Sequence, residues 1–127
     1  MRRTERYARP ASLGEALALK AADPAAAWLA GGTFLLAGDA RDKPESLIDL
    51  GAFLPRGLSA AGAALAIGAG TSFQELADSR AAPALLRRAA LGMANRNVRN
   101  RATVGGNLGA NRSCSSLIPS LLVLGAE

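Results

Sequence analysis

The sequence predicts one globular domain of the α/β or α+β class. Short apolar strands lead through glycine turns into helices, and two of those helices open with the Ser-x-x-Glu spacing of a capping box. The chain has 127 residues, of which 50% are hydrophobic and 20% charged, a balance typical of a packed domain. Aromatic residues make up only 4%, so the core must be built from Leu, Ala, Val and Ile.

The first predicted helix begins at Ser12. The Ser12 hydroxyl can accept a hydrogen bond from a first-turn amide, and the carboxylate of Glu15 can reach back in the same turn. An apolar stripe follows at helical spacing, formed by Leu13, Ala16, Leu17 and Leu19. Pro24 ends the pattern, because proline is excluded from a helix interior.

Two strands are expected in the next thirty residues. The first covers about residues 26–30 and leads into a Gly31-Gly32 turn and a second apolar run. Residues 38–46 are polar and predict a loop. The stretch "SLIDLGAF", residues 46–53, predicts the second strand, which ends in a turn at residues 55–57. These strands should pair in parallel.

The middle of the chain predicts a strand, a glycine turn and two helices. Residues 63–79 contain the strand, the turn and a helix in which Ser72 and Glu75 repeat the capping-box spacing. Residues 82–94 predict the next helix, with Leu85, Leu86 and Ala89 facing inward and Arg87 and Arg88 facing outward. We expect "RNRATVGGNLGANR", residues 99–112, to be a loop.

The last thirteen residues, 115–127, are apolar at helical spacing. Pro119 is acceptable in the first turn of such a helix, where its missing N–H costs nothing. The final "LGAE" offers no evident C-cap, and no closing strand follows it. We therefore expect residues 1–127 to be the front part of a longer protein.

Charge and cysteine content narrow the function. The formal net charge is +5, which indicates either an anionic partner or an arginine-rich solvated surface. Cys114 is the only cysteine and histidine is absent, so the sequence offers no disulfide framework, no Cys/His zinc site and no histidine base. No secretory signal or apolar stretch of membrane-spanning length occurs, which makes the cytoplasm the expected location.

Two glycine pairs are the candidate binding motifs. In "LAGGTFLL", residues 29–36, a strand feeds two glycines whose consecutive N–H groups could form an anion-binding nest, with Thr33 adding a hydroxyl. In "TVGGN", residues 103–107, Asn107 adds an amide side chain. Either motif alone could be an ordinary turn. Lining one cleft together, they could supply the donors that a diphosphate requires.

Two other motifs have weaker implications. "GAGTSF", residues 68–73, follows a strand and opens a helix, but Phe73 stands where a dinucleotide fingerprint has its third glycine. We interpret it mainly as a strand-to-helix turn. "NRNVRNR", residues 95–101, could hold an anionic cofactor, dock an acidic partner or be a solvated loop. It lacks the aromatic residues that stack on single-stranded nucleic acid.

No arrangement of catalytic side chains is evident. The acidic residues Asp39, Asp42, Glu45 and Asp49 gather in a predicted loop and strand edge. Arg112 could lower the pKa of the Cys114 thiol, but without histidine a nucleophilic role is not favoured. Any redox chemistry must therefore belong to a bound cofactor.

Taken together, these motifs resemble the FAD-binding (medium) subunit or domain of molybdenum hydroxylases, the xanthine dehydrogenase and carbon monoxide dehydrogenase group. The family pattern has "AGGT", then "IGAGTS", then "RNRATVGGNL", and the chain carries them in that order at residues 30–33, 67–72 and 99–108. The resemblance covers nearly all of residues 1–127. It implies an α+β domain of the PCMH/vanillyl-alcohol-oxidase type, containing the N-terminal lobe and the start of the second.

The resemblance also implies the cofactor residues. Both glycine segments would hold the FAD diphosphate, and Ser116 stands where relatives have an aspartate that touches FAD. The implied residues are Leu29, Ala30, Gly31, Gly32, Thr33, Phe34, Leu35, Thr103, Gly105, Gly106, Asn107 and Ser116. No catalytic residue and no metal ligand is implied in this chain.

The function implied is that of an FAD-dependent oxidoreductase subunit, similar to that of xanthine dehydrogenase. Electrons would pass from iron–sulfur clusters of a partner subunit through FAD to NAD+ or another acceptor, with a molybdenum-cofactor subunit in the same complex. Residues 1–127 alone are expected to be inactive. Two alternatives remain open: a flavin-free module that docks a partner through its basic loop, and a basic nucleic-acid-binding domain.

Overall fold

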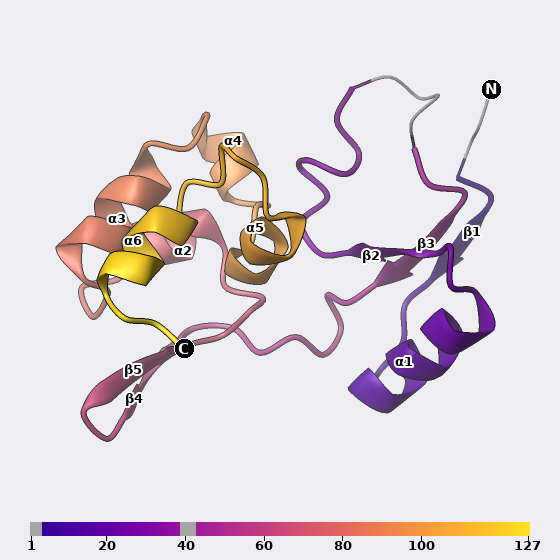
Figure 1. The fold of residues 1–127 in the computed structure, drawn as a ribbon, viewed down its shortest axis with the longest axis horizontal. Helices are drawn as coiled ribbons and strands as arrows, with labels where there is room; N and C mark the ends of the chain where they lie inside the picture. Colours follow the sequence, from indigo (N-terminus) through magenta and orange to yellow (C-terminus); the bar gives the residue numbers. More distant parts are fainter. Residues whose placement is uncertain (1–3, 39–42) are drawn as a thin grey trace. The chain divides into compact units, whose positions relative to one another are not determined.

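The computed structural model describes residues 4–38 and 43–127. Helices and strands are mixed along the chain, and the α+β prediction is confirmed (Figure 1). The chain divides into two compact units, residues 1–54 and residues 55–127, each with its own hydrophobic cluster.

The first unit is a small parallel sheet with one helix. The strands β1 (Arg6–Ala8), β3 (Ser46–Asp49) and β2 (Ala27–Leu29) lie in the order β1-β3-β2, and both pairings are parallel. The helix α1 (Leu13–Ala22) connects β1 to β2, as parallel strands require a crossover. The hydrophobic cluster of this unit consists of Ala16, Ala26 and Ile48, with Leu19, Leu50 and Phe53 packed against it.

The predicted start of α1 is confirmed. The hydroxyl oxygen of Ser12 accepts from the Glu15 N–H (3.2 Å), and the Glu15 carboxylate accepts from the Ala11 N–H (2.8 Å). The predicted apolar stripe is only partly right. Ala16 is fully buried, but Leu13 and Leu17 are more than half exposed, because the small sheet covers only a narrow strip of the helix.

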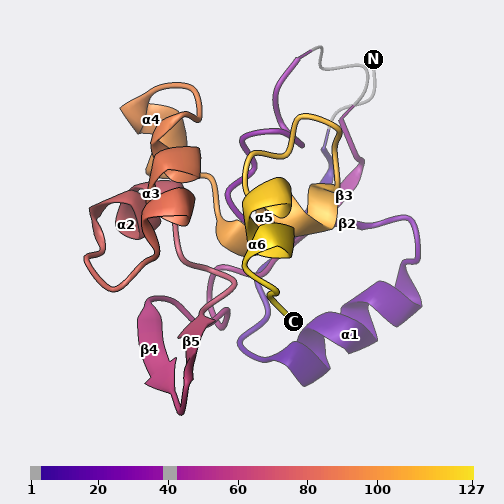
Figure 2. The same cartoon turned by 60° about the vertical axis from the view of Figure 1, so that its left-hand side comes forward.

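The second unit is mostly helical. It begins with an antiparallel hairpin of β4 (Leu58–Ala61) and β5 (Ala64–Ile67). Five helices follow, and Figure 2 shows them from a second direction: α2 (Phe73–Asp78), α3 (Ala84–Leu91), α4 (Arg96–Arg99), α5 (Val104–Ala110) and α6 (Ile118–Val123). Their core is centred on Phe73, Leu76, Leu86 and Leu117, all at most 2% exposed.

Three predictions about these helices need correction. The loop expected at residues 99–112 is largely helical, because Thr103 caps α5. In α3, Leu86 is buried and Ala89 packs against the core, but Leu85 is 42% exposed. Arg87 is also not free in solvent, since its Nε donates to the Ala77 carbonyl oxygen (3.2 Å).

The end of α6 has a cap that the sequence analysis missed. Gly125 adopts a φ of +65°, its N–H donates to Leu122 (3.1 Å), and the Ala126 N–H donates to Leu121 (3.0 Å). This pair of bonds is a Schellman motif, which satisfies the last carbonyl groups of a helix. The predicted first-turn position of Pro119 is confirmed.

Removing the largest buried side chain should test the core of the second unit. We expect Phe73→Ala to lower the free energy of unfolding by about 3–5 kcal/mol, because Phe73 is fully buried and a cavity would remain. Leu122→Ala is the control, since Leu122 is 74% exposed and its loss should cost at most about 0.5 kcal/mol. Urea denaturation of both variants measures the difference, and equal losses would contradict the assignment of the core.

Candidate functional site

The first glycine segment, residues 29–35, follows β2 directly. Leu29 ends the strand and is buried, whereas Gly32 adopts a φ of +71°, a left-handed conformation that favours glycine. A Cβ at Gly32 would lie 3.0 Å from Cδ1 of Leu29 and 3.1 Å from Cδ1 of Leu36. The Leu36 N–H donates to the Gly32 carbonyl oxygen (3.0 Å), so the chain turns tightly here.

Several backbone N–H groups of this first segment are not used in hydrogen bonds among the described residues. Within the part of the chain that the structure describes, the N–H groups of Gly32, Thr33 and Leu35 have no hydrogen-bond acceptor. All three residues are half-buried, and Phe34 between them is 52% exposed. Unpaired amides in a tight turn are the donors that an anion binds.

The second glycine segment, residues 103–107, is not the open turn that the sequence suggested. Thr103 is the N-cap of α5, and its hydroxyl oxygen accepts from the Gly106 N–H (3.0 Å). The Val104 N–H donates to Thr71 (2.9 Å), and the Asn107 N–H donates to Thr103 (3.0 Å). With the Gly105 N–H bound to Ala69 (2.8 Å), every amide from Val104 to Asn107 has a protein acceptor.

The glycine at position 105 is explained by packing. A Cβ built there would lie 2.9 Å from both the Cβ and the carbonyl oxygen of Ala69, closer than real Cβ contacts. The helix α5 therefore starts directly against the strand-to-helix turn at residues 68–71. In this segment, glycine allows one stretch of backbone to approach another.

The turn at residues 68–71 is itself fixed from behind. A Cβ at Gly68 would lie 2.4 Å from the Pro55 carbonyl oxygen, so only glycine fits. The buried hydroxyl of Thr71 accepts from the Gly57 N–H (2.9 Å) and lies 3.2 Å from the Gly57 carbonyl oxygen, to which it donates. This supports the interpretation of "GAGTSF" as a structural turn.

Asn107 and Ser115 organise the segment that carries Ser116. The Leu117 N–H donates to Oδ1 of Asn107 (3.3 Å), and the Ser115 hydroxyl donates to the Asn107 carbonyl oxygen (3.2 Å). The Ser115 hydroxyl oxygen also accepts from the Arg112 N–H (3.0 Å). Ser115 is buried and Ser116 is half-buried beside it. Sequence reasoning missed Ser115, because nothing in "SCSS" distinguishes it.

The basic motif at residues 95–101 is partly structural. Asn95 caps α4 by accepting from the Val98 N–H (3.1 Å). The guanidinium of Arg99 donates to the carbonyl oxygens of Leu91 (3.4 Å), Met93 (3.1 Å) and Ala94 (3.4 Å). Arg99 thus supports the strained turn between α3 and α4, where Ala94 has a φ of +40°.

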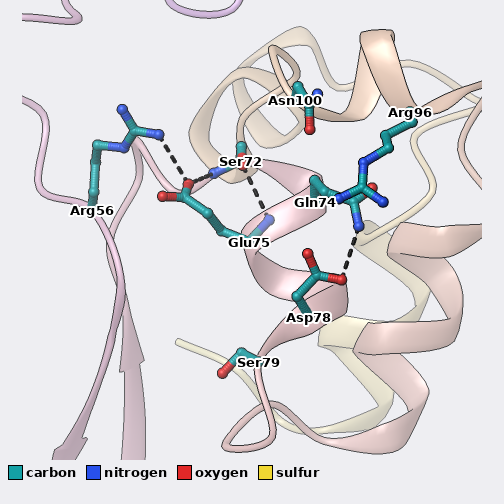
Figure 3. A pocket seen from close by; sticks show the side chains of 8 residues that line it. All are labelled: Arg56, Ser72, Gln74, Glu75, Asp78, Ser79, Arg96 and Asn100. Atoms are coloured by element: carbon teal, nitrogen blue, oxygen red, sulfur yellow. Dashed lines mark hydrogen bonds and ion pairs between the residues drawn. The ribbon is translucent and has the colours of Figure 1, made fainter.

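A hollow of about 590 Å³ lies in the second unit between α2 and α4 (Figure 3). Its lining is polar and carries both signs of charge, from Arg56, Ser72, Gln74, Glu75, Asp78, Ser79, Arg96 and Asn100. The buried Gln74 amide accepts from Nε of Arg99 (3.0 Å) and donates to Asp78 (2.9 Å). None of the predicted FAD residues lines this hollow, and it contains no cysteine or histidine.

Glu75 at the edge of this hollow completes the predicted capping box of α2. Its carboxylate accepts from the Ser72 N–H (2.7 Å) and from Nη2 of Arg56 (3.0 Å). Desolvation raises the pKa of the Glu75 carboxyl, but the Ser72 N–H, the Arg56 guanidinium and the Ser72 hydroxyl together outweigh it. The net pKa lies below its ordinary value of 4.5.

Among the residues that the structure describes, the remaining acidic and sulfur groups do not form a site. Asp39 and Asp42 lie outside the described residues, while Glu45 pairs with Arg6 (3.6 Å) and Asp49 with Arg9 (3.8 Å). No group of three metal-ligating side chains occurs within residues 4–38 and 43–127. Across the same residues, no helix has the length and apolar character to cross a bilayer. Cys114 is exposed.

Comparison with known proteins gives a family match over almost the whole chain. A family model described as "FAD binding domain in molybdopterin dehydrogenase" matches residues 2–127. The uncharacterized protein YgfM of Escherichia coli strain K12 is 39% identical over 124 residues, which are 97% of this chain and 48% of that protein. The chain therefore spans about half the length of this curated relative.

Solved structures are also similar to most of this chain. Carbon monoxide dehydrogenase from Hydrogenophaga pseudoflava matches with a TM-score of 0.77 and 37% identity, covering 85% of this chain and 40% of that one. Quinoline 2-oxidoreductase from Pseudomonas putida 86 matches with a TM-score of 0.73 and 32% identity, covering 81% and 38%. These matches support a shared fold over the part of those chains that is covered.

The lowered pKa of Glu75 makes stability depend on pH. Its carboxylate contributes stability above the ordinary pKa of 4.5, and this contribution is lost as the pH falls through the lower pKa of the folded state. In Glu75→Gln the charge is absent at every pH. We therefore expect the wild-type chain to exceed Glu75→Gln in free energy of unfolding at pH 7, with the difference shrinking toward pH 3.

Denaturant unfolding across that pH range measures the effect. Arg56→Gln is the control, because it removes the ion pair but keeps the Ser72 N–H donor, so part of the pH dependence should remain. A difference between wild type and Glu75→Gln that stays constant with pH would contradict the lowered pKa.

Proposed function

Because the chain belongs to the family of FAD-binding domains of molybdopterin dehydrogenases, we propose that it holds FAD in the flavoprotein component of a molybdenum hydroxylase. FAD is the cofactor of this oxidoreductase family. The chain covers about half of its curated relative, so the activity of the whole protein belongs to the proposal. The physical task assigned to these residues is to bind the cofactor.

The observation that supports FAD binding best is the donor set of the first glycine segment. Gly32, Thr33 and Leu35 have amides without an acceptor among the described residues, and Gly32 has the positive φ that lets the chain turn around an anion. A diphosphate carries several acceptor oxygens and would pair with such donors. These residues fit the group that the family binds.

The second segment would contribute differently. The amides of Val104 to Asn107 already have protein acceptors, so a diphosphate there would meet side chains. The Thr103 hydroxyl accepts one bond and keeps its proton to donate, and the side-chain NH2 of Asn107 is likewise a donor. We propose that Thr103, Asn107 and the half-buried Ser116 face the cofactor, while Gly105 allows the close packing against Ala69 and the Gly106 N–H holds the Thr103 hydroxyl.

When bound, FAD would supply the electron-transfer chemistry, receiving electrons from iron–sulfur clusters of a partner subunit and passing them to NAD+ or another acceptor. A molybdenum-cofactor subunit would act on the substrate in the same cytoplasmic complex. The residues of this chain would hold and orient the cofactor and supply no nucleophile or general base. We expect residues 1–127 alone to show no turnover.

The flavin-free alternative assigns the basic motif to partner docking. The Arg99 guanidinium donates hydrogen bonds to three main-chain carbonyl groups, so this arginine of the basic motif already has a structural role. The flavin-free alternative therefore has less support than FAD binding. Titration of the chain with FAD separates the two hypotheses.

FAD binding should depend on Gly32. We expect Gly32→Ala to weaken FAD binding about tenfold or more, because the new Cβ would press on Leu29 and Leu36 and the positive φ would be lost, which displaces the amide donors. Quenching of flavin fluorescence during titration of the chain measures the Kd. Thermal unfolding of each variant without FAD reports the stability separately.

Gly38→Ala is the matched control. Gly38 also has a positive φ, +80°, but a Cβ there meets no atom of the described residues within 4 Å, so it carries the strain without the displacement of residues 29–36. Its Kd for FAD should stay within about threefold of the wild-type value. Equal binding by Gly32→Ala and the wild type would contradict the role of this segment, and a wild-type chain that binds no FAD would favour the flavin-free module.

A further inference from the structure

Backbone hydrogen bonds join the turn after β5 to the start of α5. The Gly105 N–H donates to Ala69 (2.8 Å), the Val104 N–H donates to Thr71 (2.9 Å), and in return the Phe73 N–H donates to Ala102 (2.8 Å). Ser72 and Thr103 form an antiparallel bridge between these bonds. The two segments are about thirty residues apart in sequence and behave as one short ladder.

The contact between Ala69 and Gly105 is the tightest point of this ladder. The methyl group of Ala69 fills the space that a side chain at Gly105 would need, since the two Cβ positions are only 2.9 Å apart. Ala69 cannot retreat easily, because its neighbour Gly68 lies against the Pro55 backbone and the Gly70 N–H donates to Pro55 (2.8 Å). The size of residue 69 therefore sets how closely α5 approaches.

A shift of α5 would be passed on to the other predicted cofactor contacts. Thr103 is the cap of α5, and Asn107 lies one turn further along it. Asn107 holds the Leu117 N–H and the Ser115 hydroxyl, which flank Ser116. The position of all three polar contacts thus depends on where α5 begins.

We propose that Ala69 is a positioning residue for FAD: its small side chain and its carbonyl oxygen fix the start of α5, and thereby Thr103, Asn107 and Ser116. This inference rests on the proposed function. Ala69 itself faces Gly105 and is assigned no contact with the cofactor. The Ala69 methyl group already fills the space between the turn and Gly105, so a larger side chain at position 69 is expected to push α5 away.

The test exchanges the methyl group between the two positions in the full chain. Gly105→Ala places a second Cβ at 2.9 Å from that of Ala69, and we expect the Kd for FAD to rise about tenfold. The double variant Ala69→Gly/Gly105→Ala removes the Cβ–Cβ contact but keeps the 2.9 Å contact with the carbonyl oxygen of residue 69, so we expect it to recover part of that loss. Ala69→Val should weaken binding from the opposite side of the contact, with no substitution in α5 itself.

Recovery in the double variant separates positioning from a direct clash. If the new methyl group at residue 105 collided with FAD, trimming residue 69 would not restore binding. Gly109→Ala is the control, because the methyl group that it adds in α5 meets none of the described residues within 4 Å and should leave the Kd unchanged. The melting temperature without FAD, measured for each variant, shows whether binding changes more than stability does.

Two results would overturn the inference. An unchanged Kd in both Gly105→Ala and Ala69→Val, with a lower melting temperature, would assign Ala69 to stability alone. A double variant that regains the melting temperature lost in Gly105→Ala but recovers no FAD binding would assign the effect to the cofactor site directly. A wild-type chain that does not bind FAD would overturn the proposed function first, and this inference with it.

Discussion

The close approach of two backbone segments, residues 68–71 and residues 102–105, is the constraint on which the second unit depends. Hydrogen bonds between main-chain groups pull the segments together, and only hydrogen or methyl side chains fit at the contact. Glycine occupies position 105 for this reason, whereas Gly68 is required by the Pro55 backbone on the other side of the turn. Glycine at the start of a helix such as α5 costs backbone entropy. The ladder of bonds and the packing around Phe73 and Val104 offset that cost.

The two glycine pairs, Gly31-Gly32 and Gly105-Gly106, are identical in sequence, but the hydrogen bonding of the backbone N–H groups around them differs. At Gly32 the φ is positive and the amides of Gly32, Thr33 and Leu35 have no acceptor among the described residues. Gly105, in contrast, is helical and its amide is bound to Ala69. Sequence alone cannot separate these cases, because both place two small residues beside a threonine. The difference is made by a distant segment, residues 68–71, that reaches one pair.

Local signals predicted the elements whose stabilising contacts are local. The Ser12 cap, the capping box at Ser72 and the position of Pro119 follow from spacing within one turn, and the structure confirms them. The full capping box predicted at Ser12 is not formed, because the Glu15 carboxylate accepts from the Ala11 N–H. The strands β1 and β4 were missed, because neither has the alternating apolar pattern of a half-buried strand and each is defined by its partner strand. For the candidate site, the sequence predicted both glycine segments as cofactor contacts, which stays a prediction, and the positions of Ala69 and Ser115 required the tertiary structure.

The two glycine segments differ in how many backbone N–H groups they could offer to an anion. An anion at the first segment would displace only water from Gly32, Thr33 and Leu35, whereas an anion bound by the Gly106 amide would first have to break the Thr103 cap. Breaking such a cap costs about 1 kcal/mol, which is comparable to the gain from one new hydrogen bond. Backbone recognition is therefore favoured at the first segment, while the second is better suited to present preorganised side chains from a fixed frame.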